Sequence, residues 1–305
     1  MSKPLNGSGY VCSPMNYIGG KYKLLPQLLP LFPKDIRTFV DLFCGGCNVG
    51  INIRAEKIVF NDNLSYLIDL YKTFNLLDKN EIITHIDSRI SQYNLSLTNE
   101  NGYRSLRDLY NKERNPLDLF VLVAYSFNHQ IRFNNSHEFN IPFGKERSSF
   151  NPRMRRNLYS FIVALQNKKP EFIDLNFDEF DFSPYTSNDF IYCDPPYLIT
   201  TGTYNDGKRG FTGWNKTEEI KLLNILSSLN ERNIKFGLSN VLVHKDKRND
   251  ILTQWVNDNK FYVTHLNKNY SNSNYQTNNR NSQTTDEVLI TNYQPIKTYY
   301  SLFNN

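Results

Sequence analysis

Short apolar runs alternate with longer segments of helical periodicity along most of this chain, and this alternation limits the possible folds most strongly. Consecutive apolar residues fill most of each run, which is typical of strands buried on both faces of a sheet. The expected strands are Thr38–Phe43, Lys57–Asn61, Phe190–Cys193, Phe236–Ser239, Phe261–Leu266 and Val288–Thr291. The expected helices are Lys21–Leu31, Leu64–Leu77, Arg153–Gln166, Lys216–Arg232 and Asp246–Asn259. This order predicts an α/β fold with a mainly parallel sheet, helices on both faces and ligands at the carboxyl ends of the strands.

One interval interrupts the alternation. The 132 residues from Asp62 to Asp194 are far more than one crossover between parallel strands requires. We therefore expect an inserted, mostly helical domain at residues 76–155, within a sheet domain made of residues 1–75 and 156–305. Between Asn128 and Asn157 the chain has six Lys or Arg residues against two acids. The net charge of +5 permits a polyanionic partner but does not demonstrate one.

Several classes of protein are disfavoured by composition. No apolar run approaches the ~18 residues that a membrane span needs, and the N-terminus lacks the apolar core of a secretion signal. The four cysteines are too few and too scattered for a disulfide framework. Cys44-x-x-Cys47 has no second Cys or His pair at ligand spacing, so we expect no metal. We expect a cytoplasmic protein without a membrane segment.

The segment Asp194-Pro195-Pro196-Tyr197 directly follows an expected strand. The two prolines stiffen the chain there, so that a carboxylate, a carbonyl and an aromatic ring can face one small volume. A planar exocyclic amine needs these groups: Asp194 and the Pro195 carbonyl accept its N–H bonds, and the Tyr197 ring stacks on its base. The simpler interpretation is a strand-ending turn with a packed tyrosine, since short motifs often occur by chance.

A glycine turn follows the first expected strand at residues 41–50. Glycine lets the backbone approach a ligand closely. Twenty-one residues after Asp41, the next strand ends at Asp62, where an acid commonly binds ribose hydroxyls. The turn does not match the G-x-G-x-x-G pattern of NAD-binding proteins. The simpler alternative to a ligand-binding role is ordinary packing of a strand against a helix. Near the N-terminus, residues 17–21 place two glycines before a lysine, which suits either an anion contact or a plain turn.

Together these segments resemble the DNA adenine methylase (Dam) family, the D12 class of alpha-type adenine-N6 DNA methyltransferases, over nearly the whole chain. Residues 17–21 resemble its Trp-x-Gly-Gly-Lys segment, with Tyr in place of Trp. Residues 41–50 resemble its loop for S-adenosylmethionine (SAM), with Cys47 where a further glycine is usual. Residues 176–177, Asn-Phe, fall where the family often has Asp-Phe beside the SAM adenine.

The resemblance implies a Rossmann-like SAM-dependent methyltransferase sheet with an inserted, mostly helical DNA-recognition domain. It implies catalytic roles for the motif Asp194, Pro195, Pro196 and Tyr197. The residues that it implies for SAM are Tyr17, Lys21, Asp41, Phe43, Gly45, Asp62, Asn176, Phe177 and Asp194.

Residues 127–145 resemble the family's DNA-contact loop, Arg-Tyr-Asn followed by Phe-Asn-x-Pro-x-Gly, and they lie in the basic insert. Arg132 has the donors to read a guanine edge, and Asn134 or Asn140 an adenine. Basic side chains further along suit phosphates. The residues implied for DNA are Asn128, Arg132, Asn134, Asn140, Pro142, Gly144, Lys145, Arg147 and Arg155. Without this loop, a solvated basic face would be the simpler interpretation.

The implied function is a site-specific DNA adenine-N6 methyltransferase that acts on an adenine flipped out of duplex DNA. It would serve restriction–modification or the protection of phage or host DNA, beside a cognate endonuclease acting separately. Cytosine-N4 methylation stays open, because the same acceptors suit any exocyclic amine. RNA bases and protein glutamine are methylated by related loops, although the glutamine enzymes usually begin the loop with Asn. A catalytically silent DNA-binding module on the same fold is the alternative from another class.

Overall fold

A mixed sheet forms the centre of the molecule in the computed structural model, which describes residues 9–17, 19–200, 213–266 and 285–295. The strand order is β3-β2-β1-β4-β5-β8-β7, with β6 paired to β5. The strands are β1 (Thr38–Asp41), β2 (Lys57–Asn61), β3 (Glu171–Ile173), β4 (Phe190–Cys193), β5 (Lys235–His244), β6 (Lys247–Arg248), β7 (Tyr262–Leu266) and β8 (Thr285–Thr291). From β3 to β5 all neighbours are parallel, whereas β8 runs antiparallel to β5 and β7.

The helices from α3 to α8 begin at residues whose side chains cap them. They are α1 (Leu25–Leu28), α2 (Ser65–Leu76), α3 (Lys79–Gln92), α4 (Glu100–Glu113), α5 (Pro116–Tyr125), α6 (Pro152–Lys168), α7 (Lys216–Glu231) and α8 (Asp250–Asn259), with the 3-10 turns η1 (Lys21–Leu24), η2 (Leu29–Leu31), η3 (Gly50–Asn52) and η4 (Phe127–His129). An asparagine side chain accepts a first-turn N–H at the start of each helix from α4 to α8. Such a cap contributes ~1 kcal/mol to a helix and fixes where it starts.

The alternation of side chains along each strand builds two cores, one on each face of the sheet. Phe39 and Tyr192 point into a cluster that also holds residues of α2 and α6. Val40 and Ile191, their neighbours in sequence, point into a second cluster with residues of α7 and α8. These central strands are buried at every position, which explains why β4 is apolar throughout and β1 at its centre.

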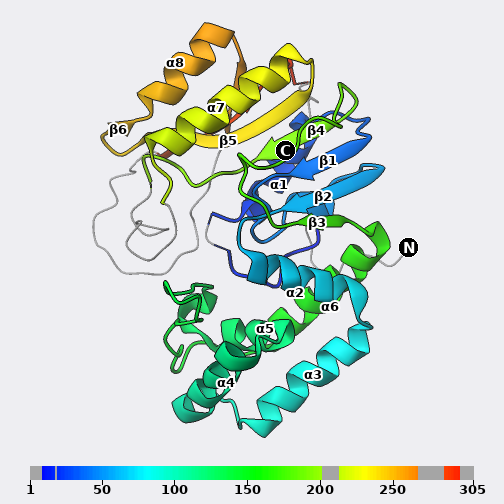
Figure 1. Cartoon of the computed structure of the whole chain (residues 1–305), viewed down its shortest axis with the longest axis vertical. Coiled ribbons are helices and arrows are strands. Elements are labelled where there is room, and N and C mark those ends of the chain that lie inside the picture. The colour runs from blue at the N-terminus through cyan, green and yellow to red at the C-terminus, as the bar shows by residue number, and fades with distance from the viewer. Residues whose placement is uncertain (1–8, 18, 201–212, 267–284, 296–305) are drawn as a thin grey trace, which may run out of the picture.

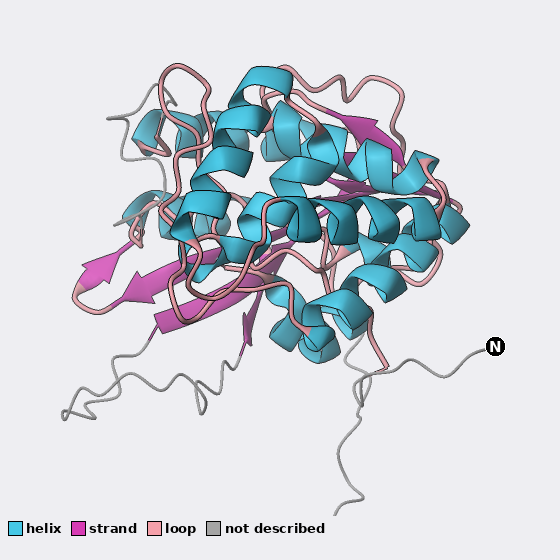
Figure 2. Ribbon diagram, turned by 90° about the horizontal axis from the view of Figure 1, so that it is seen from below, coloured by secondary structure: helices cyan, strands magenta, loops and turns pink. Residues whose placement is uncertain are grey.

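The helices α3, α4 and α5 gather at one end of the molecule, away from α7 and α8 (Figure 1). Figure 2, seen from that end, shows helices in front of the strands. Residues of this insert, including Ile82, Tyr103 and Phe120, belong to the same hydrophobic cluster as Phe39 on the sheet. The inserted helices therefore share one continuous core with a face of the sheet, through α2 and α6.

The α/β fold predicted from the sequence is confirmed, with differences at particular elements. The single helix expected at 21–31 is wrong: Pro26 and Pro30 divide this stretch into η1, α1 and η2, because proline lacks the N–H that a helix interior needs. The helix expected from Asp246 begins at Asp250, since β6 occupies residues 247–248. The sheet is less parallel than expected, because β8 reverses direction between β5 and β7.

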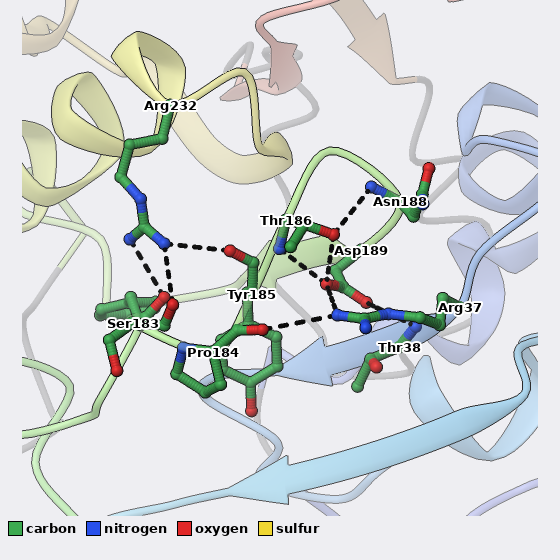
Figure 3. A network of polar contacts seen from close by, with 10 residues as sticks. Arg37, Thr38, Ser183, Pro184, Tyr185, Thr186, Asn188, Asp189 and Arg232 are labelled. Atoms are coloured by element: carbon green, nitrogen blue, oxygen red, sulfur yellow. Dashed lines mark hydrogen bonds and ion pairs between the residues drawn. The ribbon is translucent and has the colours of Figure 1, made fainter.

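A buried carboxylate fastens the amino ends of β1 and β4 (Figure 3). Asp189 Oδ1 accepts hydrogen bonds from Arg37 Nε and from the Thr38 backbone N–H, both at 2.9 Å, and its Oδ2 accepts from the Thr186 N–H at 2.8 Å. Burial acts to raise the pKa of Asp189, but these donors and the charge of Arg37 outweigh it and lower the pKa to about 2. Beside this contact, Arg232 donates to three carbonyls of the loop before β4 (Figure 3).

We predict that Asp189→Asn lowers the free energy of unfolding by about 2–3 kcal/mol at neutral pH, because charged hydrogen bonds are lost from a buried site. Since the folded pKa is lowered, the carboxylate stabilises the protein above pH ~4 and stops doing so as the pH falls towards 2. The difference between wild type and variant in urea denaturation should therefore shrink over that range. Asp35→Asn, at an exposed position, is the control. A constant difference from pH 7 to pH 2 would contradict the assignment.

Candidate active site

Three acids lie at one edge of the sheet, directly at or after the carboxyl ends of parallel strands. Asp41 is the last residue of β1, Asp62 follows β2, and Asp194 follows β4. Strand β1 pairs in parallel with both β2 and β4. The sheet thus brings together the glycine turn, the second acid and the Asp-Pro-Pro-Tyr loop at the carboxyl ends of its parallel strands, where ligands were expected.

The glycine turn is held in shape by contacts from several segments. The Gly45 N–H donates to Asp62 Oδ2 at 2.9 Å, and the Tyr71 hydroxyl donates to the Gly45 carbonyl at 2.7 Å. Gly45 has φ +43°, and a Cβ added there would lie 2.9 Å from the Tyr17 ring. Glycine is therefore required at this position both by its conformation and by the close approach of Tyr17.

Cys47 adopts φ 56°, in the left-handed region that favours glycine. This explains why a glycine is usual at this position in the family that the sequence resembles. Cys47 is fully buried, and burial raises the pKa of its thiol. The Cys44–Cys47 pair thus consists of two buried thiols within the turn.

Asp41 is buried at the start of the glycine turn and binds the backbone at its end. Its Oδ2 accepts the Gly50 N–H at 3.1 Å, and only 2 % of the residue is exposed. Burial raises the pKa of Asp41 to about 8. The contact expected between Asp41 and a cofactor stays a prediction, and the observed bond ties the end of β1 to η3.

Asp62 links the turn to the start of α2. Besides Gly45 N–H, it accepts the Leu64 N–H at 3.0 Å through Oδ1, and it remains partly exposed. Burial raises the pKa of Asp62, although these two hydrogen bonds act to lower it. Next to it, Asn63 Nδ2 donates to Asn176 Oδ1 at 3.3 Å. The ring of Phe177 packs 5.5 Å from that of Phe43.

The centre of the site is a buried ion pair between segments 173 residues apart. Lys21 Nζ lies 2.6 Å from Asp194 Oδ1 and 2.7 Å from Oδ2. The Lys21 side chain is 2 % exposed and the Asp194 side chain 19 %. Burial raises the pKa of Asp194, while the charge and hydrogen bond of Lys21 act to lower it. After Asp194, Pro195 is buried and Pro196 is exposed.

Tyr197 and Glu287 complete this polar cluster. The Tyr197 hydroxyl donates to Asp194 Oδ1 at 3.0 Å and to Glu287 Oε1 at 3.2 Å, and Lys21 Nζ lies 5.2 Å from the Tyr197 ring centroid. Glu287 on β8 is also 3.6 Å from Lys21 Nζ and only 2 % exposed. Sequence reasoning did not include Glu287 among the site residues. The available signal was an acid at the edge of a buried apolar strand, where an ionisable group needs partners.

The loop segment, residues 126–150, folds back on itself through two isolated β-bridges, Ser126–Phe143 and Phe133–Phe139. Arg132 Nε donates to Asn140 Oδ1 at 3.0 Å, so two of the residues expected to contact DNA also contact each other. Asn134 shapes the tip, where its Oδ1 accepts the N–H groups of Ser136 and Glu138. These bonds set the form of the tip independently of any nucleic acid.

The other expected DNA residues differ in their surroundings. Lys145 is exposed, and Arg147 stacks over the exposed ring of Phe127 at 4.9 Å. Arg155 instead forms an ion pair with Asp87 of α3 and lies 4.7 Å from the Phe150 ring. The remaining three residues are held within the segment or exposed on it. The Asn128 carbonyl accepts from Asn16 Nδ2, Pro142 is exposed, and a Cβ on Gly144 would meet Ser148 Oγ at 2.3 Å.

The described part of the chain offers no candidate metal site and no candidate membrane span. Its His, Cys, Asp and Glu residues form no group of three or more that could hold a metal ion. None of its helices is both long and apolar enough to cross a membrane.

Several curated proteins are similar to this chain. It is 51% identical over 300 residues to the modification methylase StsI of Streptococcus sanguinis, covering 96% of this chain and 46% of that protein. It is 51% identical over 286 residues to the type II methyltransferase M.FokI of Planomicrobium okeanokoites, covering 94% and 43%. The DNA adenine methylase of Escherichia coli is 25% identical over 286 residues, covering 92% and 95%. The chain thus spans less than half the length of the first two relatives.

A family model described as the D12 class N6 adenine-specific DNA methyltransferase matches residues 17–300, which include the Lys21 turn, the glycine turn, the loop segment 126–150, the Asp194 loop and Glu287. The match extends across the sheet and the insert alike. This chain belongs to the D12 class N6 adenine-specific DNA methyltransferase family.

Proposed function

We propose that this chain transfers a methyl group from SAM to N6 of an adenine flipped out of duplex DNA at a specific site. The observation that carries the proposal is the contact of Lys21 with Asp194, 2.6 Å apart, beside the Asp62-anchored glycine turn. It joins the acceptor loop for an exocyclic amine to residues 17–21, and the Tyr17 ring of that segment packs against the glycine turn that suits a nucleoside. The family membership and the names of the relatives support the same reaction.

The residues at the turn fit SAM as the methyl donor. Gly45 leaves the space that a Cβ would fill, and the partly exposed Asp62 has a carboxylate beside it for ribose hydroxyls. Phe43 and Phe177 offer apolar rings for the adenine, next to Asn176. SAM supplies a methyl group on a sulfonium, which is already electrophilic. Tyr17, Lys21 and Asp41 would hold the turn that faces it.

The role of Asp194 is to accept and orient the amine. Its two oxygens lie on Lys21 and Tyr197, so they are fixed before any base arrives. An incoming amine takes the place of one of these donors and finds an acceptor already aligned, with the Pro195 carbonyl as the second. Flipping the base costs a few kcal/mol, and stacking on the Tyr197 ring returns ~1–3 kcal/mol. Proximity is the larger effect, worth roughly 7–11 kcal/mol when the reacting atoms are held in line.

We propose that residues 76–155 select the DNA target and that residues 1–75 and 156–305 form the catalytic domain. The loop segment of residues 126–150 supports this, because Lys145 and Arg147 are exposed on it and Arg132 is hydrogen-bonded to Asn140. The names of the relatives, a modification methylase and a type II methyltransferase, favour restriction–modification. A cognate endonuclease would act separately, on the same DNA in the cytoplasm.

The reaction is tested by incubating the purified chain with duplex DNA and labelled SAM, then digesting the DNA to nucleosides. We expect N6-methyladenine. Asp194→Asn should reduce transfer at least ~100-fold, because the amine loses its oriented acceptor, while DNA affinity in a gel-shift assay stays near that of wild type. Label in N4-methylcytosine would replace the proposal by the cytosine alternative, and DNA binding without any transfer would indicate a silent binding module.

Glu287 gives a prediction on pH. Activity requires ionised Asp194, whose pKa is raised by burial and, in part, by the nearby charge of Glu287. Activity is therefore lost as the pH falls through that raised pKa. Glu287→Gln removes one of the causes, so the acid limb of kcat/KM should move to lower pH. Asp286→Asn, at the half-buried neighbouring position on β8 that pairs with His265 instead, is the control and should leave the limb in place. A limb that moves upward, or not at all, in Glu287→Gln would contradict this account.

Salt dependence separates two basic residues of the insert. Lys145 is exposed, so Lys145→Gln should weaken all duplexes alike and reduce the slope of log affinity against log salt by about 1. Arg155 is held by Asp87, so Arg155→Gln should change the slope less and lower thermal stability instead. Equal slopes for Lys145→Gln and wild type would argue against a phosphate contact at Lys145.

A further inference from the structure

Three aromatic rings from distant segments meet at the carboxyl edge of the sheet. The ring of Trp214 lies 5.7 Å from that of Phe43 and 5.4 Å from that of Phe177. Phe43 follows β1, Phe177 follows β3, and Trp214 directly precedes α7. Trp214 was not among the residues that the sequence singled out. It is partly exposed, so its indole is not simply enclosed in the core.

The buried carboxylate of Glu219 holds the indole of Trp214 by a hydrogen bond. Trp214 Nε1 donates to Glu219 Oε2 at 2.7 Å. The other oxygen, Oε1, accepts from Asn249 Nδ2 at 2.9 Å and from Asn240 Nδ2 at 3.2 Å. Glu219 is only 1 % exposed. A carboxylate in so buried a place is costly unless it is fully hydrogen-bonded, and here both oxygens are used.

The position of the rings relates them to the nucleoside site. Asp62 is the acid proposed for the ribose, and its neighbour Asn63 contacts Asn176, the residue before Phe177. These contacts place the three rings beside the acid proposed for the ribose, so they offer a flat apolar surface to a base attached to that ribose. Stacking on such a surface suits a purine.

We propose that Trp214 is a binding residue for the purine of the cofactor, and that Glu219 is a positioning residue that holds the indole in place. The inference rests on the proposed function, because the purine is the adenine of SAM. Glu219 reaches the purine only through Trp214, and it ties that indole to β5 and the start of α8 through Asn240 and Asn249. The competing explanation is that Trp214 only covers a corner of the core formed by α7 and α8.

Fluorescence distinguishes the two without altering the site. The chain has two tryptophans, Trp214 and Trp255. Trp255 packs on Phe261 with ring centroids 4.7 Å apart and has no ring contact with Phe43 or Phe177, so Trp255→Phe leaves Trp214 as the tryptophan reporter. We expect S-adenosylhomocysteine and adenosine to change the Trp214 emission saturably, whereas methionine, which lacks the purine, should not. An emission unaffected by either purine ligand would overturn the proposal.

Two substitutions test the contacts directly by calorimetric binding of S-adenosylhomocysteine. Trp214→Ala should raise Kd about 5- to 150-fold, the range expected for loss of one stacking contact, and Trp214→Phe should recover part of this. Glu219→Gln should raise Kd less, because its amide must turn a donor towards either the indole N–H or the two asparagine amides. In Glu219→Gln, the Trp214 emission without ligand should also shift towards that of a solvated indole, because the hydrogen bond that holds the indole is lost or weakened. Glu231→Gln, exposed at the end of α7, is the matched control.

The outcomes separate this inference from the proposed function. If wild type binds S-adenosylhomocysteine and methylates DNA, while Trp214→Ala and Glu219→Gln keep its Kd, the purine assignment fails and the reaction stands. If wild type binds no S-adenosylhomocysteine and transfers no methyl group, the proposed function fails first. Circular dichroism and thermal unfolding of each variant show whether a raised Kd comes with a native fold, and the Trp255→Phe titration does not depend on them.

Discussion

The ion pair of Lys21 with Asp194 is the contact on which the candidate site depends. It joins the N-terminal turn η1 to the loop after β4, and both side chains are largely removed from water. Removing one partner of such a pair leaves a buried charge, at a cost of about 3–5 kcal/mol. Because Tyr197 and Glu287 bind the same pair, four residues from three parts of the chain are fixed by one electrostatic arrangement.

Local sequence predicted the elements that are determined locally. Strands β2 and β4 lie where the apolar runs placed them, and the three acids follow strands as the parallel order required. Strand β3 has only three residues, so it gave no apolar run, and it forms because β2 offers a parallel edge. The helix expected before β1 failed because Pro26 and Pro30 outweigh an amphipathic pattern.

The site itself was predictable only in part, since motifs name residues but not their partners. Lys21 and Asp194 were identified separately, and only the fold shows that they touch. Glu287 and Trp214 were not named as site residues. Only the fold shows that Glu287 contacts Tyr197, 90 residues away, and that Trp214 joins a small buried network around Glu219. Arg155 looked like a phosphate ligand within a basic run, but the fold pairs it with Asp87, 68 residues away.

The continuous core beneath the insert has a consequence for how a substrate is handled. Residues of α3, α4 and α5 share one hydrophobic cluster with the sheet, so the insert and the sheet cannot swing apart without exposing that cluster to water. In the function proposed above, a long duplex bound along the insert would therefore be presented to the Asp194 edge at a set distance and angle. The nucleotide, rather than a domain, would then make the movement.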